Sequence, residues 1–584
     1  MSPVPTRTSE PGGSARKNIW TAARRSLDGL PSGGLNIAYE CVDRHVAHGR
    51  GDAVALRFLN EDGLDRQFTY HELATQTNRF ANVLTGLGAH AGDVVFGLSG
   101  RRPELYVAVL GSLKARCAVA PIFSAFGPEP VRQRLSAGRC RILVTTASAY
   151  RRKIAPVRDR LPDLAHVLLF GENADSIDEP GVQALSTLMA SANEEFTIAP
   201  TDAEDVAFVH FTSGTTGTPK GAIHVHDAVV AHHETARMVL DIGEGDVYWC
   251  TADPGWVTGM SYGLVAPLTR GATAIVDECE FDAVRWYALL EQENVTVWYT
   301  APTALRMLMK AGDEIAERSD LSRIRQAASV GEPLNPEVVL WGRRALGLTI
   351  RDTWWQTETG AIMIANTPDL PLRPGSMGKP IDGIQVGLVR RDATGARVFD
   401  AEGSPVLIDA AGQEGEIAIR TPWPSLMRGY LGAPERYTAC FADGWYLSGD
   451  LARFDEDGYV WFVGRSDDVI KSAGHLIGPF EVESVLMEHP AVAEVGVIGV
   501  PDAIVGETVK AFIELKNGYA PTDDLRRELL ALARKRLGSA VAPRQIEFSE
   551  HLPVTQSGKI LRRVLKAREL GLAIGEESSV GGTP

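Results

Sequence analysis

The segment from Thr212 to Gly221 combines residue types that can hold phosphate. It reads Thr-Ser-Gly-Thr-Thr-Gly-Thr-Pro-Lys-Gly and follows an apolar run, 206–211, that we predict to be a strand. Glycines let the backbone approach phosphate oxygens, hydroxyl and backbone N–H groups donate to them, and Lys220 adds a positive charge. The spacing differs from that of a Walker A loop. Taken alone, the segment is also compatible with a flexible polar turn.

Four further segments carry residues suited to nucleotide chemistry, in order along the chain. They are Asp352-Thr-Trp-Trp-Gln-Thr-Glu-Thr-Gly360, Tyr446-Leu-Ser-Gly-Asp450, Gly464-Arg-Ser-Asp467 and Pro553-Val-Thr-Gln-Ser-Gly-Lys559. Together the five motifs resemble the signatures of the adenylate-forming superfamily, which includes acyl-CoA synthetases, luciferases and peptide-synthetase adenylation domains. The similarity spans residues 35 to 570. Because all five occur in the family's order and spacing, we prefer this interpretation to chance matches.

The resemblance implies a site for ATP and Mg²⁺. Trp354 would stack on adenine, Thr357 would contact the α-phosphate and Glu358 would bind Mg²⁺. Asp450 would accept hydrogen bonds from the ribose hydroxyls, with Arg465 beside it. The predicted nucleotide site consists of Thr212, Ser213, Gly214, Thr215, Thr216, Gly217, Lys220, Gly331, Glu332, Pro333, Asp352, Thr353, Trp354, Gln356, Thr357, Asp450 and Arg465.

The resemblance makes Lys559 the central catalytic residue, together with Thr357 and Glu358. Lys559 would bridge oxygens of the acid and of the α-phosphate; outside this motif it would be one surface lysine among many. Acetylation would remove its charge, so we hypothesise that a lysine acetyltransferase and deacetylase act on Lys559. Gln556 replaces the arginine that is commoner in the family.

Within the superfamily the sequence is most similar to the acetyl-CoA synthetase family, as seen in 252–259, 329–333 and the two adjacent tryptophans. Trp355 stands where the usual motif has glycine, so its indole would close the acyl pocket after a methyl or ethyl group. We therefore expect acetate as substrate, poor activity with propionate and none with butyrate. The predicted acyl pocket consists of Trp256, Val257, Thr258, Val330 and Trp355. Core packing is the alternative for two adjacent tryptophans.

The implied reaction has two steps, formation of acetyl-AMP and transfer of the acetyl group to coenzyme A. The second step needs the thiol where Lys559 had been, and family members rotate a small domain about a hinge, here Asp467. The predicted CoA-binding residues are Ser472, Ala473, Gly474, His475 and Arg534. Arg534 lies in a basic run that can also face solvent. Leu476 stands where many acetyl-CoA synthetases have arginine.

The elements that position these motifs predict an α/β fold. Apolar runs at 206–211, 272–276 and 295–299 are typical of strands, and Asp282 is placed to cap a helix between the last two. Such alternation predicts mostly parallel sheets, whose ligand sites lie beyond the carboxyl ends of strands. The predicted units are a flexible N-terminal segment 1–34, a large domain 35–464, a hinge 465–467 and a small α+β domain 468–584.

Composition limits the classes of partner. The chain has 584 residues and a formal net charge of −15 without long blocks of like charge, which argues against nucleic acid or anionic membranes as partners. No secretory signal or apolar run of spanning length is visible, and the six cysteines form no Cys-x-x-Cys pair. We expect a cytoplasmic enzyme that uses acetate, ATP, Mg²⁺ and coenzyme A.

Three alternatives remain. The first is the same chemistry on propionate or another short or branched acid. The second is a carrier-loading adenylation domain, which we disfavour because no carrier motif follows in the sequence. The third is a catalytically inactive nucleotide binder, for which a complete set of reactive residues would be unnecessary. That set consists of Lys220, Glu358, Asp450, Arg465 and Lys559.

Overall fold

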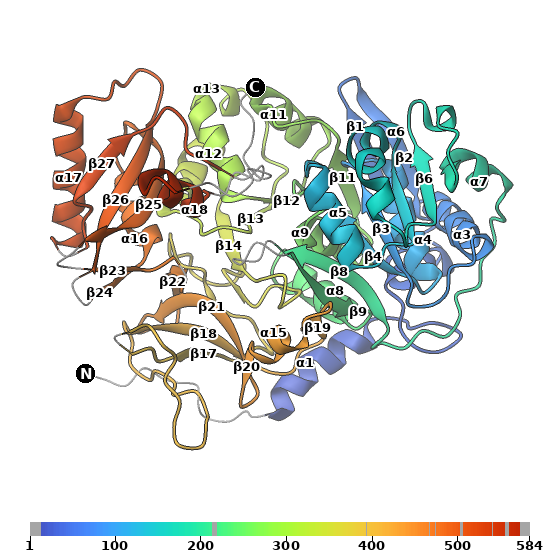
Figure 1. Ribbon diagram of the computed structural model, residues 1–584, viewed down its shortest axis with the longest axis horizontal. Coiled ribbons are helices and arrows are strands. Elements are labelled where there is room, and N and C mark those ends of the chain that lie inside the picture. Colours follow the sequence, from blue (N-terminus) through green and yellow to red (C-terminus); the bar gives the residue numbers. More distant parts are fainter. Residues whose placement is uncertain are drawn as a thin grey trace.

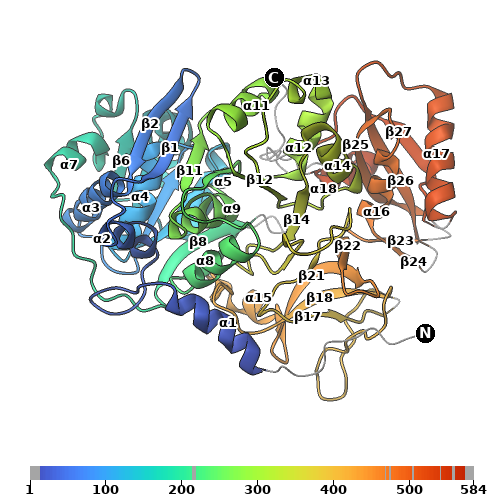
Figure 2. The same cartoon turned by 180° about the vertical axis from the view of Figure 1, so that it is seen from behind.

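The computed structural model describes residues 13–212, 219–392, 394–466, 468–472, 475–502, 506–539, 541–554 and 560–572 (Figure 1). The fold is α/β, as predicted, with two mostly parallel sheets and one antiparallel sheet in the large N-terminal part and a small α+β domain after them. Figures 1 and 2 both place the small domain on one side of the molecule and strand β6 on the other. Among the described helices, none has the length and apolar character needed to cross a bilayer.

An eight-stranded sheet carries the first predicted phosphate-binding segment. Its strand order is β19 (Gly429–Tyr430), β9 (Lys220–Val225), β8 (Val206–Thr212), β4 (Ala118–Ile122), β3 (Val94–Leu98), β5 (Ile142–Thr146), β6 (His166–Phe170) and β7 (Val182–Ala184). The pairs from β8 to β7 are parallel, whereas β8, β9 and β19 pair antiparallel. β8 confirms the strand predicted at 206–211. Thr212 and Lys220 are register partners, so both ends of the phosphate segment lie together.

A nine-stranded sheet carries the double tryptophan. Its order is β16 (Lys379–Pro380), β15 (Ile364–Ala365), β14 (Ile350–Trp354), β13 (Gln326–Ser329), β12 (Val297–Thr300), β10 (Val247–Cys250), β11 (Thr273–Asp277), β1 (Val54–Asn60) and β2 (Gly63–Thr69). The strands from β14 to β1 are parallel. β11 and β12 confirm the strands predicted at 272–276 and 295–299, displaced by one or two residues.

Helices pack on these sheets and connect their strands. The helices of the large part after residue 35 are α2 (Arg44–Ala47), α3 (Tyr70–Gly86), α4 (Pro103–Lys114), α5 (Pro128–Ala137), α6 (Ala147–Ala149), α7 (Leu185–Ser191), α8 (Ala228–Met238), α9 (Val257–Met260), α10 (Ala266–Thr269), α11 (Ala283–Gln292), α12 (Pro302–Ala311), α13 (Asp313–Ala316), α14 (Pro336–Trp341) and α15 (Pro434–Thr438). α11 begins as predicted, because Asp282 Oδ1 accepts from Arg285 N at 2.8 Å. Every residue of β4 is buried, as expected for a strand covered on both faces.

The antiparallel sheet and the small domain complete the fold. The sheet has the order β17 (Val386–Val389), β18 (Glu414–Arg420), β21 (Trp445–Phe454) and β20 (Phe441–Ala442), with β22 (Val460–Arg465) paired to β21. The small domain contains β23 (Ile470–Ser472), β24 (His475–Ile477), β25 (Val492–Asp502), β26 (Gly506–Leu515) and β27 (Gln545–Phe548), with α16 (Pro479–Met487), α17 (Asp523–Leu537) and α18 (Arg562–Glu569). Its apolar core is separate from those of the large part.

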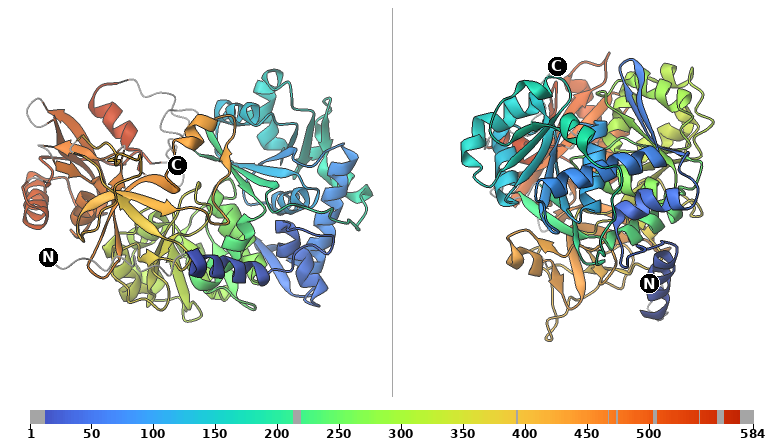
Figure 3. Two further views of the ribbon diagram at one scale, coloured as in Figure 1. Left: turned by 90° about the horizontal axis from the view of Figure 1, so that it is seen from below. Right: turned by 90° about the vertical axis from the view of Figure 1, so that its right-hand side faces the viewer.

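The described part of the N-terminal segment is helical. Helix α1 (Gly13–Arg25) packs against α8, with Trp20 9% exposed, and Arg24 forms an ion pair with Asp227 beside α8. Ile19 and Trp20 also lie against Gly383, near the antiparallel sheet. Figure 2 shows α1 below α8, and both views of Figure 3 place it on the outside of the molecule. The flexible N-terminal segment, 1–34, stays a prediction, and residues 1–12 lie outside the described part.

Candidate active site

A cleft of about 1250 Å³ collects loops from both parallel sheets, the antiparallel sheet and the small domain. Eighteen predicted site residues line it, although they come from segments far apart in sequence. They are Thr212, Lys220, Trp256, Val257, Thr258, Val330, Gly331, Glu332, Pro333, Asp352, Thr353, Trp354, Trp355, Gln356, Thr357, Glu358, Asp450 and Arg465. Residues of four of the five motifs are thus brought to one place, two of them at the carboxyl ends of strands β8 and β14 and two on the antiparallel pair β21 and β22.

Some predicted residues fall elsewhere. Ser213, Gly214, Thr215, Thr216, Gly217, Asp467, Ala473, Gly474 and Lys559, together with the side chain of His475, lie outside the described residues. Ser472 is buried in β23 and Arg534 lies near the end of α17, and neither lines the cleft. Val554 and Ile560, which flank the segment containing Lys559, form a bridge and do line it.

The Asp450 carboxylate is held by residues of the predicted nucleotide site. Trp354 Nε1 donates to Asp450 Oδ2 at 3.0 Å and Gln356 Nε2 donates to the same oxygen at 2.9 Å. Asp450 and Arg465 are register partners on β21 and β22, and their side chains form an ion pair of 3.5 Å. Asp450 is 5% exposed, so its orientation is fixed by these contacts. A buried carboxylate held in this way is suited to binding the hydroxyls of a ribose.

A tyrosine that we did not predict, Tyr430, contacts Glu358 and lies near Lys220. Tyr430 donates from its hydroxyl to Glu358 Oε1 at 2.7 Å, and Lys220 Nζ lies 5.6 Å from the centre of the Tyr430 ring. Tyr430 is on β19, which pairs with the strand that begins at Lys220. Burial and the Glu358 carboxylate raise the pKa of Tyr430, so its hydroxyl stays a hydrogen-bond donor.

Buried histidines support the turn that carries Thr357 and Glu358. His232 Nε2 lies 2.8 Å from the carbonyl oxygen of Gly360, and burial lowers the pKa of His232 to about 4. The neutral ring can therefore donate to this carbonyl. Gly360 has φ +71°, and a Cβ there would lie 2.2 Å from the oxygen of Ser425. The final glycine of the motif is thus required by the tight packing of this turn.

Trp355, of the predicted acyl pocket, contacts two buried tyrosines. Its indole Nε1 donates to the Tyr299 hydroxyl at 3.3 Å, and its ring packs edge-on against Tyr262 at 5.1 Å between centroids. Trp256 packs against Phe123, also at 5.1 Å. Phe123, Tyr262 and Tyr299 were missed by sequence analysis because each lies in an apolar run that is indistinguishable from ordinary core. The indole of Trp355 is partly exposed, so it forms a wall of the cleft.

The small domain forms the remaining wall. Phe480 and Glu483 from α16, Glu494 from β25 and Arg562 from α18 all line the cleft. Arg562 Nη2 lies 2.7 Å from both carboxylate oxygens of Glu483. This ion pair joins α18 to α16 directly after the segment that ends at Ile560. The geometry of the wall is therefore set within the small domain.

Comparisons with known proteins agree with this arrangement. A family model described as AMP-binding enzyme matches residues 43–431, and one described as AMP-binding enzyme C-terminal domain matches residues 481–559. The chain is 45% identical to an acetyl-coenzyme A synthetase of Bacillus subtilis, over 96% of this chain and 95% of that protein. It is 39% identical to an acetyl-coenzyme A synthetase of Methanothrix thermoacetophila, over 94% of this chain and 85% of that protein.

Solved structures give the same result. An acyl-CoA synthetase of Brucella canis has a TM-score of 0.71 and 35% identity, covering 94% of this chain and 97% of its own. An anthranilate CoA ligase in complex with anthranoyl-AMP has a TM-score of 0.82 and 29% identity, covering 92% and 98%. These similarities confirm the resemblance inferred from the five motifs: the chain belongs to the AMP-binding enzyme family, within the adenylate-forming superfamily.

Proposed function

We propose that this protein is an AMP-forming acetate–CoA ligase, which converts acetate, ATP and coenzyme A into acetyl-CoA, AMP and pyrophosphate. The observation that carries the proposal is that Trp355 lines the cleft next to Trp354, the residue that donates to Asp450. We infer that an acid bound against this indole has room for only a very short chain. The names of the similar synthetases from Bacillus subtilis and Methanothrix thermoacetophila support acetate.

In the first step, an acetate oxygen attacks the α-phosphorus of ATP, the bond to the bridging oxygen breaks, and pyrophosphate leaves. Lys220 lies at the end of the phosphate segment, where its positive charge would stabilise the departing pyrophosphate. Thr357 would donate to the α-phosphate. Lys559, outside the described residues, would bridge the acid and α-phosphate oxygens.

Glu358 fits the predicted role of a Mg²⁺ ligand. Its carboxylate is a hard oxygen donor in the cleft, oriented by the Tyr430 hydroxyl, and Mg²⁺ is typically held by one or two carboxylates and by substrate phosphates. When bound, the ion would supply positive charge to the phosphates. Asp450 would hold the ribose hydroxyls, and the 331–333 loop would border the adenine.

In the second step, the thiol sulfur attacks the acetyl carbonyl carbon and AMP leaves. The predicted hinge at 465–467 would let the small domain move, because few residues join β22 to β23. Ser472 and Arg534 do not line the cleft in the present arrangement, so their proposed CoA contacts require the small domain to turn. Action of acetylating and deacetylating enzymes on Lys559, and a cytoplasmic location, stay predictions.

Pyrophosphate release with ATP and Mg²⁺ tests the proposal. The assay compares acetate, propionate, butyrate and octanoate, each with and without coenzyme A. We expect the highest kcat/KM with acetate, a lower value with propionate and continuous turnover that depends on coenzyme A. A preference for octanoate would refute the pocket assignment, and a preference for propionate would favour the alternative short-acid ligase. Absence of turnover with every acid would refute the enzymatic function.

A further inference from the structure

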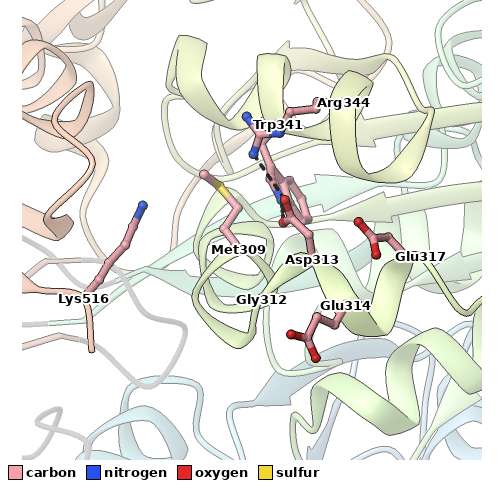
Figure 4. Close-up of a pocket in the computed structure, with 8 residues that line it drawn as sticks. All are labelled: Met309, Gly312, Asp313, Glu314, Glu317, Trp341, Arg344 and Lys516. Atoms are coloured by element: carbon pink, nitrogen blue, oxygen red, sulfur yellow. Dashed lines mark hydrogen bonds and ion pairs between the residues drawn. The ribbon is translucent and has the colours of Figure 1, made fainter. Parts of the chain in front are cut away.

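The small domain meets the nucleotide side of the cleft through polar and aromatic contacts. Arg306 pairs with Glu494, Lys310 with Glu514 at 2.6 Å and Asn335 with Ser484 at 3.1 Å, and the ring of Phe462 packs against that of Phe480 at 5.9 Å between centroids. A smaller cleft of about 320 Å³ is lined by Lys516 of the small domain together with Met309, Asp313 and Glu314 of the large part (Figure 4). Interfaces between domains that are rich in polar contacts commonly allow the domains to move relative to one another.

Arg306 differs from the other crossing residues because it also contacts the predicted adenine loop. Its Nη2 lies 3.1 Å from Glu332 Oε2, 3.0 Å from Glu494 Oε1 and 2.7 Å from Thr303 Oγ1. Thr303 in turn donates to both carboxylate oxygens of Glu332, at 2.9 and 2.8 Å. Glu332 follows β13 in the large part, whereas Glu494 belongs to β25 of the small domain. One guanidinium therefore joins the loop to the domain.

Burial makes this contact matter more than the outer pairs. The side chain of Arg306 is 10% exposed, as is that of Glu332, whereas the side chain of Lys310 is 44% exposed. Burial opposes the charge on Arg306, but Glu332 and Glu494 hold its pKa above the ordinary value. Burial raises the pKa of Glu494, and Arg306 opposes this shift. Exposed pairs such as Lys310 with Glu514 contribute little, because water and salt screen them.

We propose that Arg306 is a positioning residue that couples nucleotide binding to docking of the small domain. The inference rests on the proposed function, because it takes the Glu332 loop to border the adenine. A bound nucleotide that orients Glu332 also orients Arg306, so that Arg306 can pair with Glu494 when the small domain docks. In turn, pairing of Glu494 with Arg306 favours the conformation of the 331–333 loop that binds nucleotide. Such coupling is reciprocal by thermodynamic necessity. Lys310 with Glu514, which does not contact the loop, lacks this effect.

The test compares Glu494→Gln with Glu514→Gln, two substitutions that each remove one negative charge from the small domain. The readouts are the Kd for AMP from calorimetry, and KM for ATP and for acetate from pyrophosphate release. We expect Glu494→Gln to raise the Kd for AMP and the KM for ATP about fivefold or more, at the lower end of typical coupling, with KM for acetate unchanged. Glu514→Gln should change each value less than about twofold.

A double-mutant cycle adds a second measurement. If Arg306 carries the coupling, Arg306→Met with Glu494→Gln should bind AMP no more weakly than Arg306→Met alone. Unchanged AMP binding in Glu494→Gln, or equal losses in Glu494→Gln and Glu514→Gln, would overturn the proposal. If Arg306→Met does not fold, Glu494→Gln still decides the question. AMP binding needs no acid, so this readout remains valid if the proposed ligase activity fails.

Discussion

Replacing Trp355 by glycine should extend the acyl pocket. The indole packs against Tyr262 and donates to Tyr299, and its removal opens space at the end of the cleft. The Tyr299 hydroxyl keeps a partner, because it lies 2.7 Å from Thr353 Oγ1, so the new pocket wall leaves no unpaired hydroxyl there. Butyrate has two more methylenes than acetate, and at about 0.8 kcal/mol for each buried methylene they contribute about 1.6 kcal/mol. We therefore expect Trp355→Gly to prefer butyrate over acetate by roughly 15-fold in kcat/KM.

The assay is pyrophosphate release over acids of two to eight carbons, with the wild type and Trp461→Gly measured alongside. Trp461 donates to Asp455, is partly buried and does not line the cleft, so Trp461→Gly controls for loss of a tryptophan elsewhere. We expect Trp461→Gly to keep the preference for acetate. If Trp355→Gly folds and retains activity but still prefers acetate, another residue limits chain length and the pocket reasoning is wrong.

Two further predictions concern buried charges. Glu416 is fully buried and accepts hydrogen bonds from Arg391 and Arg397 at 2.7 Å and from Gly449 N at 2.8 Å. Because Glu416→Gln removes the charge that pairs with the two arginines, it should lower the free energy of unfolding in urea by about 3 kcal/mol. A loss below about 1 kcal/mol would contradict the argument. Burial raises the pKa of Asp253 to about 6, although Arg101 opposes it. The folded-state pKa of Asp253 exceeds the unfolded value. The contribution of the protonated Asp253 to the free energy of unfolding is therefore fully present below about pH 4 and is lost as pH rises through about 6. The free energy of unfolding of Asp253→Asn should therefore exceed that of the wild type by about 2 kcal/mol at pH 8, a value that allows for the exposure of this site to the open cleft, and by less at pH 5. An equal gain at both pH values would exclude titration of Asp253 as the cause.

Features that depend on residues close together in the sequence could be predicted. The strand at 206–211, the cap at Asp282 and the motif from Asp352 to Gly360 depend on neighbouring residues, and the structure contains each of them. The α/β fold class was also predicted from the alternation of strands and helices, and motif residues that the structure describes line one cleft. Roles assigned to residues outside the described part stay predictions.

Contacts between distant segments could not be predicted in this way. Tyr430 meets Glu358 across 72 residues, and Arg306 meets a carboxylate in another domain, with no local pattern to mark either. The packing of helix α1 was not predicted either. Polar composition at 1–16 gave no indication of the buried positions Trp20 and Ala23 that follow it.

Helix α1 is synthesised well before the residues against which it packs. Arg24 pairs with Asp227, 203 residues further on, and Trp20 lies against Gly383. On a ribosome adding roughly 5–20 residues per second, the helix must wait at least about ten seconds for the first of these partners. During that interval the apolar face of α1 is exposed, so burial of this helix requires that the later segments have folded.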